Sequence, residues 1–229
     1  MSNQALSLYL EKEKGYFQAA RLDLLEMLPS RNDLHILEVG AGEGATLKAA
    51  KERRLATYTV GIELVAPELE SENPIGVDVF LAGDFETMDL QVFENSFDVV
   101  ICGDVLEHLR DPWTSVRRLT RLLKPNGLLL SSIPNFRNHR VLRSIVFQGD
   151  FRYADAGLLD RTHLRFFCRT NARDLFEQAG LVVETIETNM GAYGLRHRLL
   201  DFLTLGYLHD FFVFQFRICA RKSEMEEDF

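Results

Sequence analysis

Short apolar runs alternate with amphipathic segments along most of the chain, which is the order typical of an α/β domain. The apolar runs that predict strands cover residues 34–39, 58–64, 77–82, 97–103, 128–133, 181–188 and 211–220. Helical spacing of apolar residues occurs in the segments 4–28, 45–51, 112–123 and 171–179. The run at 97–103 is almost wholly apolar, as a strand covered on both faces must be. The pattern therefore predicts a doubly wound, mostly parallel sheet of seven strands with helices on both faces.

The composition fits one globular domain with a small cap. The chain has 229 residues, of which 46% are hydrophobic, and a formal charge of −8. This charge repels nucleic acid and anionic membranes from the molecule as a whole, although a local patch can differ from the average. The three cysteines form no C-x-x-C pair, and no apolar run reaches membrane-spanning length. We expect a single domain over 1–229 in a cytoplasmic protein, with no membrane span and no nucleic-acid partner.

Three alternate glycines follow the first predicted strand, in the run Glu38-Val39-Gly40-Ala41-Gly42-Glu43-Gly44. Such a turn between a strand and a helix forms the nucleotide pocket of many α/β domains, because glycine lets backbone approach a ligand. The spacing also fits a dinucleotide fingerprint, with Glu63 at about the ribose-reading distance of ~20 residues. A pyrophosphate disfavours nearby carboxylates, but acids lie in the turn and near later strand ends: Glu38, Glu43, Asp84, Asp104 and Glu107. Such a rim suits a cation, and S-adenosylmethionine carries a sulfonium and an ammonium.

Later strand ends supply further candidate residues. Glu63 is placed to accept both ribose hydroxyls, and its alternative is a surface charge at the end of a strand. Asp84 is placed to accept from the adenine amino group, with Phe85 against the ring, and Asp84 can also cap the next helix. The loop that carries Asp104 and His108 follows the fourth strand, so it should face the reactive end of the cofactor.

The N-terminal segment 1–30 is interpreted as a helical flap over the pocket. In this interpretation Tyr16 and Arg21 close over the cofactor, with Arg21 on its carboxylate. The alternative is an ordinary packing helix with a solvated arginine, and the sequence leaves both open.

Five motifs within residues 34–133 resemble those of class I S-adenosylmethionine-dependent methyltransferases, in the order of that family. They are the glycine turn at 37–44, Val60-Gly61-Ile62-Glu63, Gly83-Asp84, Phe97-Asp98-Val99-Val100 with Leu106-Glu107-His108-Leu109, and Leu123-Lys124-Pro125-Asn126-Gly127. The resemblance implies a Rossmann-like fold whose last strand is antiparallel, with 34–133 as its cofactor-binding half. It assigns the cofactor to Glu38, Gly40, Ala41, Gly42, Gly44, Glu63, Leu64, Asp84, Phe85, Cys102, Gly103 and Asp104. At Ala41 the family more often has Cys or Ser, which is a conservative departure.

Residues 134–169 are unusually rich in arginine and aromatic side chains. Eight arginines lie from 137 to 173, against three aspartates in the same stretch. We interpret 134–169 and 190–208 as substrate cap segments, in which guanidinium groups bind phosphate or carboxylate. The predicted substrate-binding residues are Arg161, His163, Arg165 and Asn135. The alternatives are that Asp160 pairs with a neighbouring arginine to pin the loop, and that 190–208 packs into the core; this second segment could also shelter a lipid-like substrate or a dimer face.

Two runs narrow the resemblance. Ile133-Pro134-Asn135-Phe136 and the run 160–167 resemble bacterial methyltransferases found with glycan and polysaccharide biosynthesis, and the layout is also similar to the MetW-like group. This resemblance implies a small or lipid-linked anionic acceptor, with a sugar as one class, and a monomer or homodimer. A MetW-like regulatory partner of a biosynthetic enzyme is the second interpretation, and an NAD-dependent oxidoreductase is the third.

Methyl transfer from a sulfonium is an in-line displacement, for which alignment and exclusion of water supply most of the rate. A base is needed only when the nucleophile carries a proton, and His163 and His108 are the candidates. Either can instead be a structural hydrogen-bonding group. Asp104, Glu107, His108 and His163 also resemble the divalent-metal set of small-RNA 2′-O-methyltransferases and some quinone-biosynthetic relatives. Because the first position has Asp where a longer Glu is usual, and the chain is acidic, we expect no metal.

Overall fold

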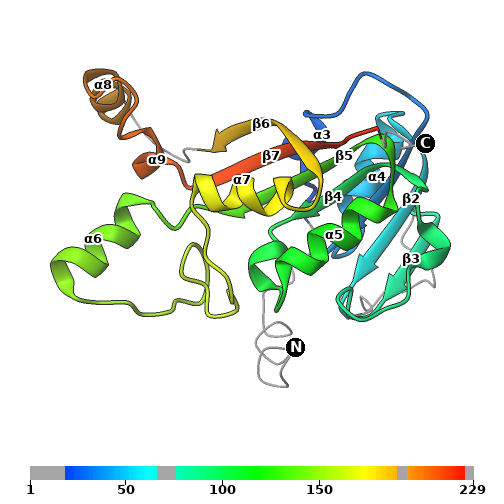
Figure 1. Ribbon diagram of the computed structural model, residues 1–229, viewed down its shortest axis with the longest axis horizontal. Helices are drawn as coiled ribbons and strands as arrows, with labels where there is room; N and C mark the ends of the chain where they lie inside the picture. Colours follow the sequence, from blue (N-terminus) through cyan, green and yellow to red (C-terminus); the bar gives the residue numbers. More distant parts are fainter. Residues whose placement is uncertain (1–18, 66–75, 190–194, 225–229) are drawn as a thin grey trace, which may run out of the picture.

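Seven strands form one sheet in the order β3-β2-β1-β4-β5-β7-β6 (Figure 1). The computed structural model describes residues 19–65, 76–189 and 195–224. The strands are β1 (Leu34–Val39), β2 (Ala56–Glu63), β3 (Val79–Ala82), β4 (Phe97–Gly103), β5 (Leu123–Pro134), β6 (Leu181–Asn189) and β7 (Gln215–Lys222). Neighbours from β3 through β5 pair in parallel, and β7 pairs antiparallel with both β5 and β6. The predicted Rossmann-like sheet with an antiparallel last strand is confirmed.

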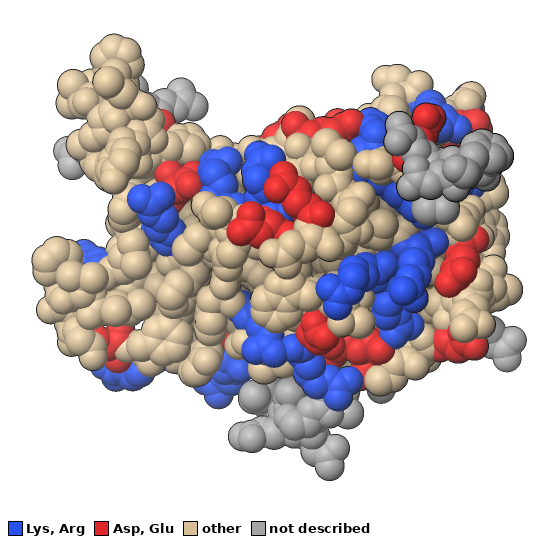
Figure 2. Space-filling view, in the orientation of Figure 1, with Lys and Arg blue, Asp and Glu red and all other residues tan. Residues whose placement is uncertain are grey.

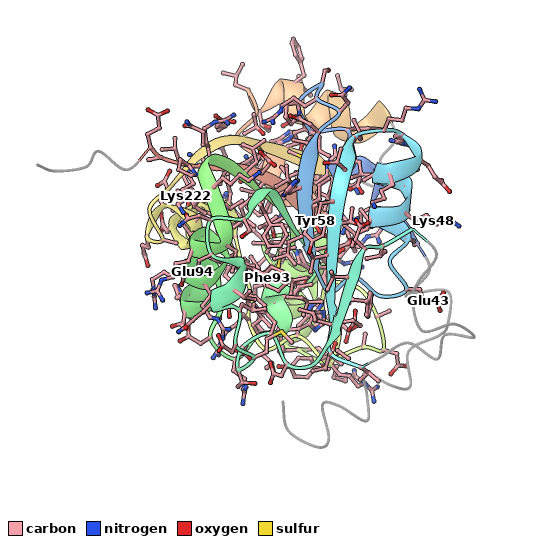
Figure 3. The ribbon with its side chains drawn as sticks, turned by 90° about the vertical axis from the view of Figure 1, so that its right-hand side faces the viewer. Glu43, Lys48, Tyr58, Phe93, Glu94 and Lys222 are labelled. Carbon is pink, nitrogen blue, oxygen red and sulfur yellow. The ribbon has the colours of Figure 1, made fainter. Side chains whose placement is uncertain are left out.

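Helices cover both faces of this sheet. The helices of the described residues are α3 (Leu22–Leu25), α4 (Ala45–Glu52), α5 (Pro112–Leu122), α6 (His139–Gln148), α7 (Arg169–Glu177), α8 (Leu195–Leu203) and α9 (His209–Phe212). Two short 3-10 helices, η1 (Gln91–Phe93) and η2 (Leu106–His108), complete the set. Figure 3 shows the sheet from its β3 side, with α4 on one face and the helices α5 and α7 on the other. None of the helices in these described ranges is long and apolar enough to cross a membrane.

Alternation along the strands explains the two-sided core. Ile36 packs with α3 and α4 in one cluster, while Leu37 packs with α5 and α7 in the other. In β4 the same alternation sends Ile101 to the first cluster and Val100 to the second. Burial on both faces is what makes these strands nearly continuous apolar runs.

Helix starts follow local sequence signals. The Asp111 carboxylate accepts from the backbone N–H of Thr114, and Pro112 occupies the first turn of α5, where no hydrogen-bond donor is needed. Gly44 precedes α4 with φ 80°, a left-handed conformation that favours glycine. Helix α7 begins at Arg169 with Cys168 as its N-cap, two residues earlier than the start predicted at residue 171.

Two predictions about elements need correction. The run 211–220 was expected to be a strand, but Phe211 and Phe212 belong to α9 and β7 begins at Gln215. A short aromatic run does not by itself distinguish a buried helical turn from a strand. The helix expected over 4–28 is reduced, within the described residues, to Leu22–Leu25. Residues 1–18, which include Tyr16, lie outside the described residues.

Core packing, one of the alternatives for the segment 190–208, is wrong for the side chains described in it, which are those from 199 onward. Leu199, Leu200, Phe202 and Leu203 of α8 are exposed, as are Leu205 and Tyr207 just after it. Apolar character alone therefore did not indicate burial in this segment.

Candidate functional site

A cavity of about 330 Å³ opens at the carboxyl edge of the sheet, where β1, β2, β3 and β4 end. Its lining includes Arg21 and predicted cofactor residues from all four strand ends: Glu38, Gly40, Ala41, Gly42, Glu63, Leu64, Asp84, Phe85, Gly103 and Asp104. Of the two candidate bases, His108 lies in its wall. The structure thus brings most of the predicted cofactor set around one space, at the edge where ligands bind in open α/β sheets.

Glycine is required at two points of the wall. A Cβ on Gly40, which has φ 73°, would lie 2.5 Å from Cγ2 of Val105. A Cβ on Gly103 would lie 2.8 Å from Nη1 of Arg21. Side chains at these positions would push the β4–η2 loop or Arg21 out of place, so the spacing of the glycine motif has a direct steric cause.

Glu38 is the most perturbed carboxyl group of the cavity. Its side chain is buried, and burial raises its pKa to about 8, with a smaller contribution from the nearby Glu63. A hydrogen bond from Thr46 and the charge of Arg21 act in the opposite direction. Its Oε2 atom is buried and has no hydrogen-bond partner among the described residues. A buried acceptor of this kind is costly unless a donor reaches it, and an ammonium group would supply one.

Arg21 connects the ends of β4 and β5 with helix α4 at the cavity. Its guanidinium donates to Asp104 at 2.6 Å and to the Ser132 hydroxyl at 2.8 Å, and it also pairs with Asp23. Its backbone N–H donates to the Thr46 hydroxyl. Arg21 is therefore held in the wall by the protein itself, and its predicted contact with the cofactor carboxylate remains a prediction.

Glu63 holds the glycine turn in shape. One carboxylate oxygen accepts from the backbone N–H of Gly42 at 2.7 Å, and the other accepts from that of Leu64 at 2.6 Å. Each oxygen has a second lone pair for a further donor, so this geometry leaves the predicted ribose role open. The carboxylate is buried at the end of β2, not a surface charge.

Asp84 caps no helix in the described residues, because a turn follows it, and its predicted contact with the adenine amino group stays a prediction. One oxygen accepts from the backbone N–H of Glu86, as in a turn, and the other accepts from the Arg110 guanidinium at 3.1 Å. Phe85 is buried beside it, with the Arg118 guanidinium 5.2 Å from the ring centre. Both residues line the cavity.

Two predicted cofactor residues, Gly44 and Cys102, do not line the cavity. Gly44 caps α4, and Cys102 is buried at the end of β4, where its carbonyl accepts from the Ser131 hydroxyl. Burial raises the pKa of the Cys102 thiol well above its usual range, so this group stays protonated. Glu43, expected in the acidic rim, lies at the periphery of the molecule (Figure 3) and outside the cavity lining.

The two candidate histidines meet, although 54 residues separate their positions in the chain. The His108 and His163 rings lie edge to face, with centroids 4.8 Å apart, and both side chains are buried. His108 Nδ1 lies 3.0 Å from the carbonyl of Thr162, and His163 Nδ1 lies 3.3 Å from that of Leu158. A carbonyl only accepts, so each Nδ1 carries the hydrogen and each Nε2 is the basic nitrogen.

Glu107 lies with this histidine pair. One potential ligand atom from each of Glu107, His108 and His163 falls within 4.8 Å of the others. Two imidazoles and a carboxylate are a donor set that suits Zn²⁺ or a similar ion. The carbonyl of Glu107 also accepts from the N–H groups of Leu164 and Arg165, which fixes the inserted loop to η2.

The predicted substrate residues have partners within the protein. Arg161 forms an exposed ion pair with Asp155, and the Arg165 guanidinium donates to the carbonyl of Arg110. Asn135 is buried and donates to the carbonyls of Asp210 and Val213. Asp160, expected to pair with a neighbouring arginine, accepts from the N–H and hydroxyl of Thr162. None of these arginines lines the cavity formed by the described residues.

Thr46 and Ser132 were missed from sequence. Thr46 is buried in the first turn of α4 and lines the cavity, and the Ser132 hydroxyl, near the end of β5, accepts from the backbone N–H of Asp104. A signal was present for Ser132, because a polar pair at the end of an otherwise apolar strand is unusual. Thr46 had no such signal, since it reads as an ordinary helix residue.

Comparison with known proteins decides the family. A family model described as a methyltransferase domain matches residues 9–186. The chain belongs to this methyltransferase family. Among curated relatives, a ubiquinone biosynthesis O-methyltransferase of Paracidovorax citrulli is 30% identical over 181 residues, covering 70% of this chain and 72% of that protein. One from Neisseria meningitidis is 30% identical over 132 residues, so the match spans 55% of that protein's length and 55% of this chain.

Solved structures show the same fold at low identity. A methyltransferase of Haloferax volcanii, solved with the activator Trm112, has a TM-score of 0.63 at 17% identity and covers 98% of this chain and 96% of its own. An S-adenosylmethionine-dependent methyltransferase of Mesorhizobium loti has a TM-score of 0.58 at 17% identity, covering 88% and 96%. The family supports S-adenosylmethionine as the cofactor.

The residues of the cavity fit this cofactor. Oε2 of Glu38, which no described residue pairs, is placed to accept from a cation, and Glu63 and Asp84 present further acceptors. Gly40 lines the cavity with bare backbone, because Val105 leaves no room for a Cβ there. A pyrophosphate would instead meet Glu38, Glu63 and Asp104 along the same wall. These carboxylate acceptors therefore suit a cationic cofactor better than a dinucleotide.

Proposed function

We propose that this chain transfers the methyl group of S-adenosylmethionine to a hydroxyl oxygen of a small or lipid-linked anionic acceptor. The observation that carries the proposal is that Glu38, Gly40, Asp104 and His108 line one cavity. Its wall therefore holds both a buried acceptor for a cation, Oε2 of Glu38, and a basic histidine. The cofactor supplies an activated methyl group when bound. What the chain adds is alignment, exclusion of water and a place for the acceptor proton.

His108 is the residue placed to receive that proton. It lines the cavity, and its Nδ1–H donates to the Thr162 carbonyl, which fixes the ring and makes Nε2 the acceptor. His163 packs edge to face against it, so the second ring orients the first. A hydroxyl nucleophile needs such a base, whereas a thioether or a neutral amine does not.

Oxygen as the methylated atom is supported by the relatives, whose name specifies O-methyl transfer. The anionic character of the acceptor rests on the arginine-rich segment 134–169, including Arg161 and Arg165. Sugars stay within the proposal as one class of acceptor to be tested, and transfer to nitrogen is its alternative.

Transfer of a labelled methyl group tests the proposal. The purified chain is incubated with methyl-labelled S-adenosylmethionine and three acceptor sets: phenolic acids with long alkyl tails, sugar phosphates, and a total lipid and metabolite extract. Transfer to a hydroxyl of at least one set is the expected result. If the cofactor binds but no acceptor in any set becomes labelled, the chain acts as a cofactor-binding partner in the MetW manner.

A further inference from the structure

Helix α6 and the segment after it carry apolar side chains on an exposed surface. Phe147 is 83% exposed, and its neighbour Val146 is also exposed near the end of the helix. Phe151 and Tyr153 follow, half-exposed and packed against the Phe166 ring. This aromatic packing anchors the protruding segment to the body of the protein. We call Val146, Phe147, Phe151 and Tyr153 the α6 patch.

Helix α8 and the turn after it carry a second such surface. Phe202 is 76% exposed and Leu205 is 94% exposed, and Leu199, Leu203 and Tyr207 are exposed with them. These five residues form the α8 patch. In Figure 1 both helices project from the same end of the molecule, at the left, and Figure 2 shows mainly uncharged side chains over both projections. Exposed apolar surface of this extent marks an interaction site.

Strand topology places both patches at the cavity edge of the sheet. Pro134, the last residue of β5, pairs with Gln215 of β7, and Gln215 also pairs with Asn189, the last residue of β6. Both strands therefore end at one edge, and the chain continues from them toward α6 and α8. Because β5 runs parallel to β4, this is also the edge where the cofactor cavity opens.

The α6 side of this end has a charge opposite to that of the whole chain. Residues 136–153 contain four arginines (137, 140, 143 and 152) and one aspartate (150), a formal charge of +3, whereas the full chain carries −8. Arg140 and Arg143 are exposed on α6 itself. Arg152 is exposed and pairs with Asp150. Positive side chains beside exposed aromatic and aliphatic ones are the features of a helix that lies in a lipid interface.

We propose that the α6 and α8 patches together bind the surface of a bilayer that contains anionic lipid. The apolar side chains enter the boundary between headgroups and acyl chains, and the arginines of α6 meet lipid phosphates. A second copy of the chain fits less well, because a two-fold axis through α6 would bring its arginines against their own copies. Docking in this orientation turns the cavity edge toward the bilayer. The binding surface does not depend on the proposed methyl transfer.

Vesicle flotation of the full chain tests this surface. The probes are phosphatidylcholine vesicles with and without phosphatidylglycerol. We expect flotation with the anionic vesicles, weakened by added salt, and little with pure phosphatidylcholine. Phe147→Glu and Phe202→Glu, one in each patch, should each lower binding roughly tenfold, and Arg143→Gln should lower it for anionic vesicles only.

Val92→Glu is the matched control, because Val92 is 81% exposed on η1, outside both patches. It should float as the unchanged chain does, with the same thermal midpoint as the other variants. Equal flotation of all variants, or no flotation with either vesicle, would overturn the proposal. A dimer in light scattering that Phe147→Glu dissociates, without any vesicle binding, would overturn it in favour of a self-interface.

Discussion

The cofactor half of the sheet and the inserted segments after β5 and β6 use the same residue types in different ways. In the cofactor half, acids such as Glu38 and Glu63 are buried and point at a cavity or its backbone. In the inserted segments, charges pair locally at the surface, as Arg161 does with Asp155, and apolar residues such as Phe202 face outward. Backbone geometry therefore fixes where the charged groups of the cofactor half lie. In the inserted segments their positions depend on local contacts.

The contrast shows in which region a sequence motif is informative. A glycine turn constrains every neighbour within contact distance, so its chemistry can be inferred from spacing. An arginine-rich insertion has many ways to satisfy its charges within the protein. Variants in the two regions should therefore separate cofactor effects from acceptor and surface effects.

The largest effect is expected at the glycine wall. Gly40→Ala should reduce cofactor binding below detection, because its Cβ would lie 2.5 Å from Val105 Cγ2 at the cavity. Gly180→Ala is the control, since Gly180 has φ 80° and no heavy atom within 4 Å of a built Cβ. Both should lose about 1–2 kcal/mol of stability to left-handed strain. Calorimetric titration and thermal unfolding measure the two effects, and equal cofactor affinity in both variants would contradict the steric account.

The histidine pair should control the rate and not cofactor binding. His108→Asn should lower kcat by roughly 10²- to 10⁴-fold on a hydroxyl acceptor, because the basic Nε2 is lost. His163→Asn should lower it less and shift the pH profile, because that ring positions the first. Steady-state kinetics over a pH series, with cofactor affinity measured in parallel, distinguish these roles.

Removal of metal ions tests whether the histidine pair binds a metal instead of transferring a proton. Because we assign proton transfer to His108, activity should persist after dialysis against a chelator. Loss of activity that Mn²⁺ or Zn²⁺ restores would make Glu107, His108 and His163 a metal site instead.

Glu38 should make both stability and cofactor affinity depend on pH. Its pKa is raised from 4.5 to about 8 in the folded chain, so the folded state holds a proton that the unfolded state releases. The free energy of unfolding should therefore fall as pH rises from 4.5 to 8, by an amount on the order of a few kcal/mol. A cation pairs with the ionised form, so cofactor affinity should rise over the upper part of that range, with release of a proton.

Titration of S-adenosylhomocysteine in buffers of different ionisation enthalpy measures this proton. Glu38→Gln should abolish its release and weaken binding about 10- to 100-fold, because a charged hydrogen bond is lost. Glu26→Gln, an exposed carboxyl change, is the control and should behave as the unchanged chain. Proton release that survives in Glu38→Gln would assign the titrating group elsewhere.

The smallest effect is expected in the inserted loop. Arg161→Ala or Arg165→Ala should raise the acceptor KM by roughly severalfold while cofactor affinity stays nearly unchanged, because a solvent-exposed charge contributes little. Arg173→Ala, in an exposed pair with Glu177 on α7, is the matched control. A parallel fall in cofactor affinity would show that Arg161 and Arg165 serve the fold.

The sequence predicted most where backbone constraints are strongest. The run Phe97–Gly103 was placed to the residue as β4, because continuous burial leaves no other pattern. The cofactor residues at four strand ends followed from parallel topology, which brings those ends to one edge. The proximity of His163 to His108 depended on how the insertion folds back onto η2. The exposed aromatic residues of the insertion resemble core residues in the sequence. Local periodicity does not show whether an apolar face packs against the protein or against something outside it.

The central claim is that the acidic cavity at the carboxyl edge of the sheet is built for a cationic methyl donor. Calorimetric titration of the purified chain with S-adenosylmethionine and, separately, with NAD tests it most directly. The account predicts saturable binding of S-adenosylmethionine that Gly40→Ala abolishes, and no binding of NAD. Saturable binding of NAD without binding of S-adenosylmethionine would contradict it.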